Sequence, residues 1–411
     1  MPPPFLGGKV GEGMSIIMPG SGIVTAGWDP FAPIFKVIDK YYYGVDHQAV
    51  RIVCGVAESH WILNGDPSWL FIQGPPSSGK TAISIVAGQA IKGVKSIDDL
   101  TSNTFLSGFY GHDAPGILES LGEPDNPQVK VGKDWYTHAN GLLTWADWTV
   151  ILAKAQAERD AIYGQLRRIY DGELAKNTGT GIRKSWKGKI TILAAVTDAI
   201  EHEQHARASM GDRFMTVRWP RADWMAAKMA LDQQGQEEMI KSQLHAVCEN
   251  LFKVGGGIQL PVLTDAQKTI LACMADLTAW CRTPVLRKGM GELAFRPSIE
   301  GPPRICKNIT NMAKGIATIH CQNYLSDRDV FDACRLAWDS IPIDRADVIR
   351  AFAQGMALCA MPLQDALKSR AFGELMELGI VNNNDTFTPR FRDLVEVVGK
   401  ETLIRIGKDT A

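Results

Sequence analysis

The chain has 411 residues, of which 45% are hydrophobic and 22% are charged, and its formal net charge is −1. This composition excludes a disordered or fibrous protein, and it excludes attraction of nucleic acid through overall charge. The eight cysteines include no C-x-x-C pair, which argues against a zinc ribbon and favours a reducing compartment. Because no apolar run is long enough for a membrane span and the first residues lack a secretory signal pattern, we expect a cytoplasmic protein without a membrane partner.

The first half of the sequence predicts an α/β core. Residues 1–45 are rich in Pro and Gly at their start and read as an N-terminal arm. An amphipathic helix is predicted from Asp46 onward, and SWLFIQ (68–73) predicts a buried strand. A Gly-rich segment and a further helix (81–91) follow, and VKVGKDWYTHANG (129–141) reads as a hairpin.

A second series of strands completes this predicted core. GLLTWADW (141–148) is the next strand, and the long helix after it is expected to end near Ile169-Tyr170, with Asp171-Gly172 as its stop. LAKNTGTGIRKSWKGK (174–189) predicts a hairpin that leads into the apolar strand ITILAAVT (190–197). The stretch MGDRFMTVRWPRADW (210–224) closes an α/β core that we assign to residues 46–225.

The remaining sequence is helical in character. Residues 226–342 are predicted to form a helical lid, in which one helix face carries a series of large apolar residues and Ser326-x-x-Asp329 begins the next helix as a capping box. The apolar residues of that face are Ile305, Ile309, Met312, Ile316 and Ile319. Residues 343–411 suit a winged-helix domain whose wing turns at 382–385.

The segment from Gly74 to Thr81 fits the phosphate-loop pattern G-x-x-x-x-G-K-[ST] and lies between a predicted strand and a predicted helix. In such a loop the backbone N–H groups surround phosphate oxygens, Lys80 reaches the β and γ phosphates, and the Thr81 hydroxyl binds Mg²⁺. A Gly/Pro-rich turn that contains Lys-Thr by chance is the alternative. The pattern predicts ATP and Mg²⁺ as ligands of Gly74, Pro75, Pro76, Ser77, Ser78, Gly79, Lys80 and Thr81.

The strand GLLTWADW ends in one carboxylate where motor ATPases usually have two. Asp147 could hold Mg²⁺, with Trp148 in the place of the catalytic base. It could instead orient the attacking water, with Ala146 in the metal-holding place. A third possibility is an Asp that caps the helix beginning at Thr149. Strand ends beside a phosphate loop are where this fold places its site, which favours a catalytic and metal-binding role for Asp147.

The order of these parts resembles the AAA+ ATPases, and within them the helicases of the minichromosome maintenance type and related ATPases of phages and mobile elements. In those proteins a glycine and an apolar strand lead to Asp-Glu-Phe, which Gly141 to Trp148 matches with Ala146, Asp147 and Trp148. The resemblance therefore implies the water-orienting role for Asp147, and the departure at Ala146 bears on metal affinity and turnover.

The resemblance also implies roles for three further residues. Thr197 resembles the polar sensor of the γ-phosphate, with a simple helix cap as the alternative. Arg213 resembles the arginine finger that one subunit offers to a neighbour's nucleotide, and its rival is Arg218. The alternative for Arg213 is a surface arginine that pairs with Asp212 or Asp223. Arg304 is similar to the second sensor of the lid, with a solvated residue at a helix start as the alternative.

The hairpin before the last core strand is basic. Arg183, Lys184, Lys187 and Lys189 surround Trp186, so the cations could follow a phosphate backbone and the indole could stack on a base. A solvated hairpin is the alternative, but minichromosome maintenance-like proteins carry their DNA-gripping hairpin here. We therefore expect an ATP-driven ring motor, as a hexamer, that acts on single-stranded or forked DNA beside other replication proteins. The alternative is a nucleotide-gated helicase loader or initiator with little turnover.

Overall fold

The computed structural model describes most of the chain: residues 29–62, 65–83, 94–98, 100–101, 104–106, 116–121, 129–131, 134–177, 183–202, 213–252, 259–288 and 292–408. Most of the predicted arm, and the predicted helix beyond residue 83, lie outside these residues. Within them, no helix combines the length and the apolar composition that crossing a membrane requires.

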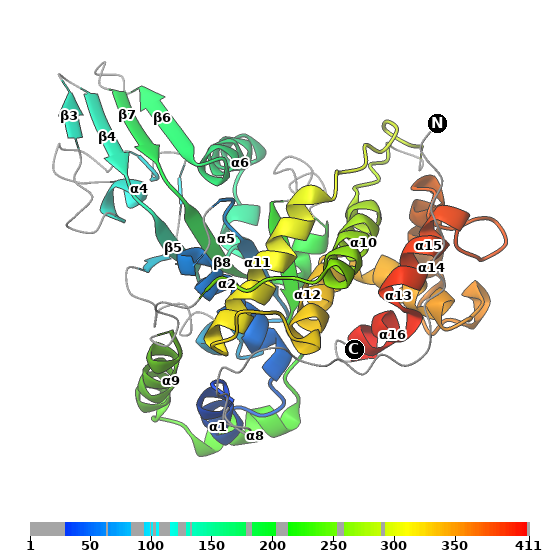
Figure 1. The fold of residues 1–411 in the computed structure, drawn as a ribbon, viewed down its shortest axis with the longest axis horizontal. Coiled ribbons are helices and arrows are strands. Elements are labelled where there is room, and N and C mark those ends of the chain that lie inside the picture. Colours follow the sequence, from blue (N-terminus) through cyan, green and yellow to red (C-terminus); the bar gives the residue numbers. More distant parts are fainter. Residues whose placement is uncertain are drawn as a thin grey trace.

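A five-stranded parallel sheet forms the centre of the fold, in the order β2-β5-β8-β1-β9. Helices flank this sheet, so the predicted α/β class is confirmed at this level (Figure 1). The strands are β1 (Trp69–Gln73), β2 (Lys95–Ile97), β5 (Gly141–Trp145), β8 (Ile190–Val196) and β9 (Phe214–Arg218). β8 lies between β1, which leads into the phosphate loop, and β5, which leads to Asp147.

Side chains alternate between two hydrophobic clusters, one on each face of the sheet. On β1, Trp69 and Phe71 belong to one cluster, and Leu70 and Ile72 belong to the other. The first cluster includes residues of α5 (Thr149–Leu152) and α6 (Gln156–Tyr170), whereas the second includes the helices of the C-terminal half. Both faces of the sheet are therefore buried, as near-continuous apolar strands predict.

Helix α2 (His47–Ile62) lies inside the molecule, against the sheet and α11 (Pro303–Ile319). The prediction of an amphipathic helix is wrong here, because every residue from 49 to 60 is buried. Gly55 and Gly315 allow the two helices to approach closely: a Cβ on Gly315 would lie 2.0 Å from the Gly55 carbonyl oxygen. The predicted apolar face of α11 is confirmed, since all five of its named residues are buried.

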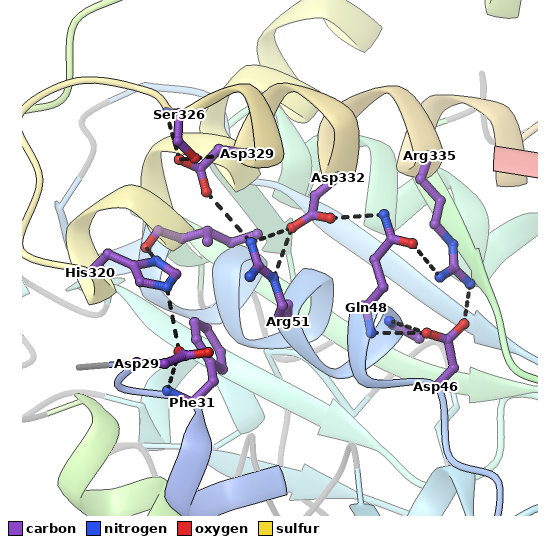
Figure 2. Close-up of polar contacts among 12 residues, drawn as sticks. Asp29, Phe31, Asp46, Gln48, Arg51, His320, Ser326, Asp329, Asp332 and Arg335 are labelled. Carbon is purple, nitrogen blue, oxygen red and sulfur yellow. Dashed lines mark hydrogen bonds and ion pairs between the residues drawn. The ribbon is translucent and has the colours of Figure 1, made fainter. Parts of the chain in front are cut away.

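A buried set of charged side chains joins α2 to α12 (Asp327–Asp339), as Figure 2 shows. Arg51 Nη2 lies 2.7 Å from Asp332 Oδ2 and 3.6 Å from Asp329 Oδ1. Arg335 pairs with Asp46 and donates to Gln48 Oε1 at 2.9 Å. The predicted capping box at Ser326 is also present, so one end of this set is fixed by the start of α12.

The two predicted hairpins are confirmed, and they join into one four-stranded sheet in the order β3-β4-β7-β6. β3 and β4 are antiparallel, β6 and β7 are antiparallel, and β4 pairs with β7 in parallel. Figure 1 shows this sheet extending away from the core, above β5 and β8. Its strands are β3 (Val129–Val131), β4 (Asp134–His138), β6 (Glu173–Asn177) and β7 (Arg183–Lys187), and α4 (Ile117–Ser120) lies below them.

The predicted domain boundaries differ from the observed packing. Helix α1 (Ala32–Tyr41) buries Ile34 and Ile38 in the core, so the predicted arm does not extend to residue 45. The boundary at 225/226 falls inside α8 (Trp224–Asp232). One continuous hydrophobic cluster includes residues on both sides of 342/343, because the C-terminal helices pack on α10 (Asp265–Arg282) and α12.

The C-terminal region consists of helices around a tight turn. Val381 and Phe387 form a single antiparallel bridge around the predicted wing turn. The remaining helices are α9 (Glu237–Phe252), α10 (Asp265–Arg282), α13 (Ile343–Ala353), α14 (Asp365–Glu377), α15 (Pro389–Val398) and α16 (Lys400–Lys408). In Figure 1, α13 to α16 lie together at one end of the molecule.

Candidate nucleotide-binding site

The phosphate loop follows β1 at the carboxyl edge of the sheet. Ser77 and Gly79 have positive φ values of 60° and 78°, and a non-glycine residue in this conformation is strained. Such turns direct successive N–H groups to one side, where they form an anion-binding concavity. A helix begins at Lys80, so its first N–H groups face the same region. The loop therefore has the backbone shape that binding of a phosphate requires.

Contacts with the rest of the fold fix the loop. Gly74 N–H donates to the Val196 carbonyl at 3.1 Å, and a Cβ on Gly74 would lie 2.6 Å from the Trp219 carbonyl oxygen. The Trp219 indole donates to the Ser78 carbonyl at 3.0 Å. Lys80 Nζ donates to the Pro75 carbonyl at 2.9 Å. The lysine ammonium thus lies over the loop, and the buried Ser78 hydroxyl has no hydrogen-bond partner among the described residues.

Asp147 and Thr197 lie at the same edge of the sheet. Asp147 is exposed, and its Oδ1 accepts from the Thr149 N–H at 2.9 Å, so the predicted alternative of a helix cap is present. Burial lowers the pKa of Lys80, and the charges of Asp147 and Asp198 oppose this shift. Asp147 therefore lies near Lys80 even though it also caps the helix. Thr197 Oγ1 lies 3.3 Å from Thr149 Oγ1. The structure therefore gathers Lys80, Asp147 and Thr197 near the loop.

A cavity of about 840 Å³ opens beside the loop and was not anticipated from the sequence. Its lining combines phosphate-loop residues with the Tyr41-Tyr42-Tyr43 run and with residues of α8 and α9. Tyr42 packs over the loop: its ring lies 3.6 Å from where a Cβ on Gly79 would be. The cavity is large enough for a nucleotide, and its aromatic and alanine side chains suit a planar base. The three consecutive tyrosines were the sequence signal that could have indicated it.

Arg213 and Arg304 lie together at the opposite, amino edge of the sheet. Their guanidinium carbons are 5.4 Å and 5.7 Å from the Tyr170 ring centroid, and that ring packs on Trp69 at the start of β1. Since the loop follows the other end of β1, a strand of five residues and about 13 Å separates these arginines from their own phosphate loop. Arg304, predicted to bind nucleotide as the second sensor of the lid, therefore lies far from the phosphate loop of its own chain.

The ion-pair and hydrogen-bond partners of Arg213, Arg304 and Arg218 can be compared with the predicted alternatives. Arg213 is 9% exposed and pairs with Asp171 at 3.1 Å, whereas the predicted alternative placed its partner at another aspartate. Arg304 lies 3.4 Å from Glu300. Arg218, the rival finger, is buried at the carboxyl edge and donates to the Ile341 carbonyl. The two candidate fingers thus lie at opposite edges of the sheet, Arg213 before the start of β9 and Arg218 at its end.

The basic hairpin divides its charges between two faces. Trp186 is completely buried and its indole donates to the Ala139 carbonyl at 2.9 Å, so the prediction that it stacks on a base is wrong. Lys184 shares the face of Trp186, because side chains alternate along a strand, and Arg183 and Lys187 lie exposed on the other face. Lys189 Nζ donates to the His60 carbonyl at 3.1 Å, and burial lowers its pKa to about 8. An exposed basic pair thus remains from the predicted DNA contacts.

No protein-family model and no curated protein sequence matches this chain at a significant level.

Proposed function

We propose that this chain binds and hydrolyses ATP. The observation that carries the proposal is the phosphate loop, with its two left-handed residues, opening on the cavity and lying beside Asp147 and Thr197. In this arrangement, the loop N–H groups and Lys80 would neutralise phosphate charge, and Asp147 would orient the attacking water. The Tyr41-to-Tyr43 run would hold the base.

The same edge of the sheet suits Mg²⁺. The Thr81 hydroxyl and the Asp147 carboxylate are hard oxygen ligands of the type that Mg²⁺ prefers, and the ion usually retains water and phosphate ligands as well. These two residues would hold it, and it would offset phosphate charge during hydrolysis. After β5, only Asp147 offers a side-chain oxygen to the ion, because Ala146 has none.

We further propose that the site is completed by a second copy of the chain in a ring oligomer. Arg213 and Arg304 lie about one strand length away from their own loop, so they can serve only the nucleotide of a neighbour. An arginine supplied in this way stabilises charge on the transferred phosphoryl group. In the present arrangement Arg213 pairs with Asp171, so that ion pair must open or rotate when the neighbour docks.

The work done by hydrolysis is proposed to be movement along DNA, as an AAA+ helicase of a replication system. Arg183 and Lys187, exposed on one face of the projecting hairpin, are the residues that would contact the phosphate backbone. The second candidate is a nucleotide-gated switch, such as a loader or initiator, which binds ATP and turns over little. Ala146 is the observation that favours this candidate.

Steady-state ATPase with and without single-stranded DNA tests the proposal. The motor predicts turnover that DNA stimulates and that Lys80→Ala and Asp147→Asn each reduce by at least about 100-fold. Lys268→Ala, which removes an exposed cation from α10, serves as the control and should leave turnover unchanged. Turnover at background with intact ATP binding would favour the switch, and absence of ATP binding would exclude both candidates.

A further inference from the structure

Only one carboxylate, Asp147, follows β5, but a second carboxylate follows the neighbouring strand β8. β8 lies between β1 and β5 and ends at Val196. Asp198 follows two residues later, at the start of a 3₁₀ helix (Asp198–His202), and its side chain is exposed. No role was predicted for Asp198, because it belongs neither to the phosphate-loop pattern nor to the strand GLLTWADW that leads to Asp147.

Backbone and side-chain contacts bring the segment containing Asp198 against the segment containing Asp147. Trp148 N–H donates to the Ala195 carbonyl at 2.8 Å, and the hydroxyls of Thr149 and Thr197 lie 3.3 Å apart. Each contact involves a residue within three positions of one of the two aspartates. The charges of both carboxylates also reach Lys80, where each favours the protonated amine.

Gln73, the last residue of β1, orients the Asp198 carboxylate. The Gln73 side chain is 3% exposed, and its Nε2 donates to Asp198 Oδ1 and to Glu201 Oε1, both at 3.1 Å. Its Oε1 is buried and has no hydrogen-bond partner among the residues that the structure describes. A buried oxygen without a partner, directly before the phosphate loop, is an acceptor that a hydrated cation or an ordered water would satisfy.

The two carboxylates on Gln73 are not equivalent. Glu201 Oε1 lies 4.0 Å from Arg218 Nη2, and its side chain is 15% exposed. Glu201 therefore neutralises a buried guanidinium of its own chain. Asp198 is exposed and follows β8 at the carboxyl edge of the sheet, so it is the carboxylate that can bind a ligand from outside the chain.

We propose that Asp198 is the second carboxylate of the magnesium–nucleotide site and that it supplies, from β8, the acid that Ala146 lacks on β5. This inference rests on the proposed binding of ATP and identifies a further residue of the same site. Gln73 is a positioning residue in this arrangement, because it fixes one oxygen of Asp198 and leaves the other for the metal or for a metal-bound water.

Binding of Mn²⁺ tests the proposal without a measurement of activity. Mn²⁺ replaces Mg²⁺, and electron paramagnetic resonance of the full chain with ADP gives the affinity of the protein–ADP complex for the metal. Asp198→Asn should weaken this affinity on the order of 10-fold, while ADP affinity in EDTA stays unchanged. Glu201→Gln, which alters the other carboxylate on Gln73, is the matched control and should bind Mn²⁺ as the wild type does.

Three results would contradict the proposal in distinguishable ways. Wild-type Mn²⁺ affinity in Asp198→Asn would remove Asp198 from the metal site and leave the proposed ATP binding intact. An equal loss of ADP affinity in EDTA would show that Asp198 only maintains the loop. A wild-type chain that binds no ADP under either condition would instead refute the proposed function itself.

Discussion

Two regions of this molecule use charged side chains in opposite ways. Between α2 and α12, Arg51 and Arg335 are completely buried, and each faces carboxylates of the same chain (Figure 2). At the carboxyl edge of the sheet, Asp147 and Asp198 are exposed, and the buried hydroxyl of Ser78 has no partner among the described residues. In the first region each guanidinium is paired with carboxylates of its own chain, although Arg51 Nη1 and Asp329 Oδ1 form no hydrogen bond among the described residues. In the second region the carboxylates are exposed and can be reached by a ligand.

This difference separates stability from function. Removing one member of a buried ion pair leaves an uncompensated charge and costs several kcal/mol, because the low dielectric offers no replacement partner. Removing an exposed carboxylate costs the fold little, so its loss is measured in ligand binding. Arg213 lies between these cases: it is paired within its own chain, but at an edge where a second copy could compete for it.

The largest effect is expected for Arg213→Ala. If Arg213 serves a neighbour's nucleotide, kcat should fall on the order of 10³-fold or more, with ADP affinity unchanged because the residue lies far from its own loop. Asp171→Asn is the control: it breaks the same ion pair and keeps the guanidinium. ATPase assays that show equal losses in both variants would mean that the ion pair, rather than catalysis, explains the effect.

Substitutions in the buried α2–α12 region should lower the free energy of unfolding. Arg51→Ala is expected to lower the free energy of unfolding by about 3–5 kcal/mol, since it leaves the carboxylates of Asp329 and Asp332 without their cation. Arg168→Ala removes a pair with Glu173 that is exposed, and should cost no more than about 1 kcal/mol. Urea unfolding of both variants checks the contrast, and similar losses would contradict it.

Helix α2 also buries two titratable groups whose pH effects oppose each other. Burial raises the pKa of Glu58 to about 7, so stability falls as pH rises from about 4.5 to 7. Burial, with a smaller effect of Lys189, lowers the pKa of His60 to about 3, so stability falls as pH drops from 6.5 toward 3. Between pH 4.5 and 6.5 the contributions of Glu58 and His60 should largely cancel.

Removing one of these two groups should reveal the other. In Glu58→Gln, the free energy of unfolding should decrease by about 1.4 kcal/mol for each unit that pH falls from 6.5 to 4.5. In His60→Gln, it should increase over the same fall in pH. Denaturant titrations at several pH values measure both slopes, and slopes of the same sign would show that these groups are not buried as described.

The smallest effect is expected at the basic hairpin. The double variant Arg183→Ala, Lys187→Ala should reduce the slope of log K against log salt for single-stranded DNA by about 2, one for each lost phosphate contact. The matched control is the double variant Lys176→Ala, Lys184→Ala, whose two lysines lie opposite each other on the other hairpin face. This variant should leave the slope unchanged. The reverse result would assign DNA to the face of Trp186.

Local patterns predicted the elements that surround the site better than the relations between distant elements. The strands β1, β5 and β8, the end of α6 at Tyr170 and the apolar face of α11 follow from periodicity and turn residues, and these predictions are confirmed. The segment from Gly74 to Thr81 has left-handed backbone at Ser77 and Gly79, and its binding of phosphate stays a prediction. The burial of α2 could not be predicted, because a helix with only a few charges does not reveal that its polar residues meet α12 across the fold.

The positions of Trp186, Arg304 and Asp198 depend on the same kind of relation between distant elements. Trp186 resembles a base-stacking residue in sequence, but parallel pairing of β4 with β7 turns this strand so that the indole meets Ala139. Arg304 begins a helix, as predicted, and only the path of α11 shows that this start lies at the amino edge of the sheet. Asp198 was missed because its importance depends on β8 lying beside β5, which sequence order does not give.

The central claim is that one chain holds the triphosphate and a second chain completes the site, and a mixing experiment tests it most directly. Lys80→Ala lacks the loop lysine but retains Arg213, whereas Arg213→Ala has the complementary defect. Each variant alone should be inactive, and the mixture should recover ATPase activity because mixed oligomers contain some intact interfaces. A mixture that co-assembles yet stays as inactive as its components would contradict the claim, as would full activity of Arg213→Ala alone.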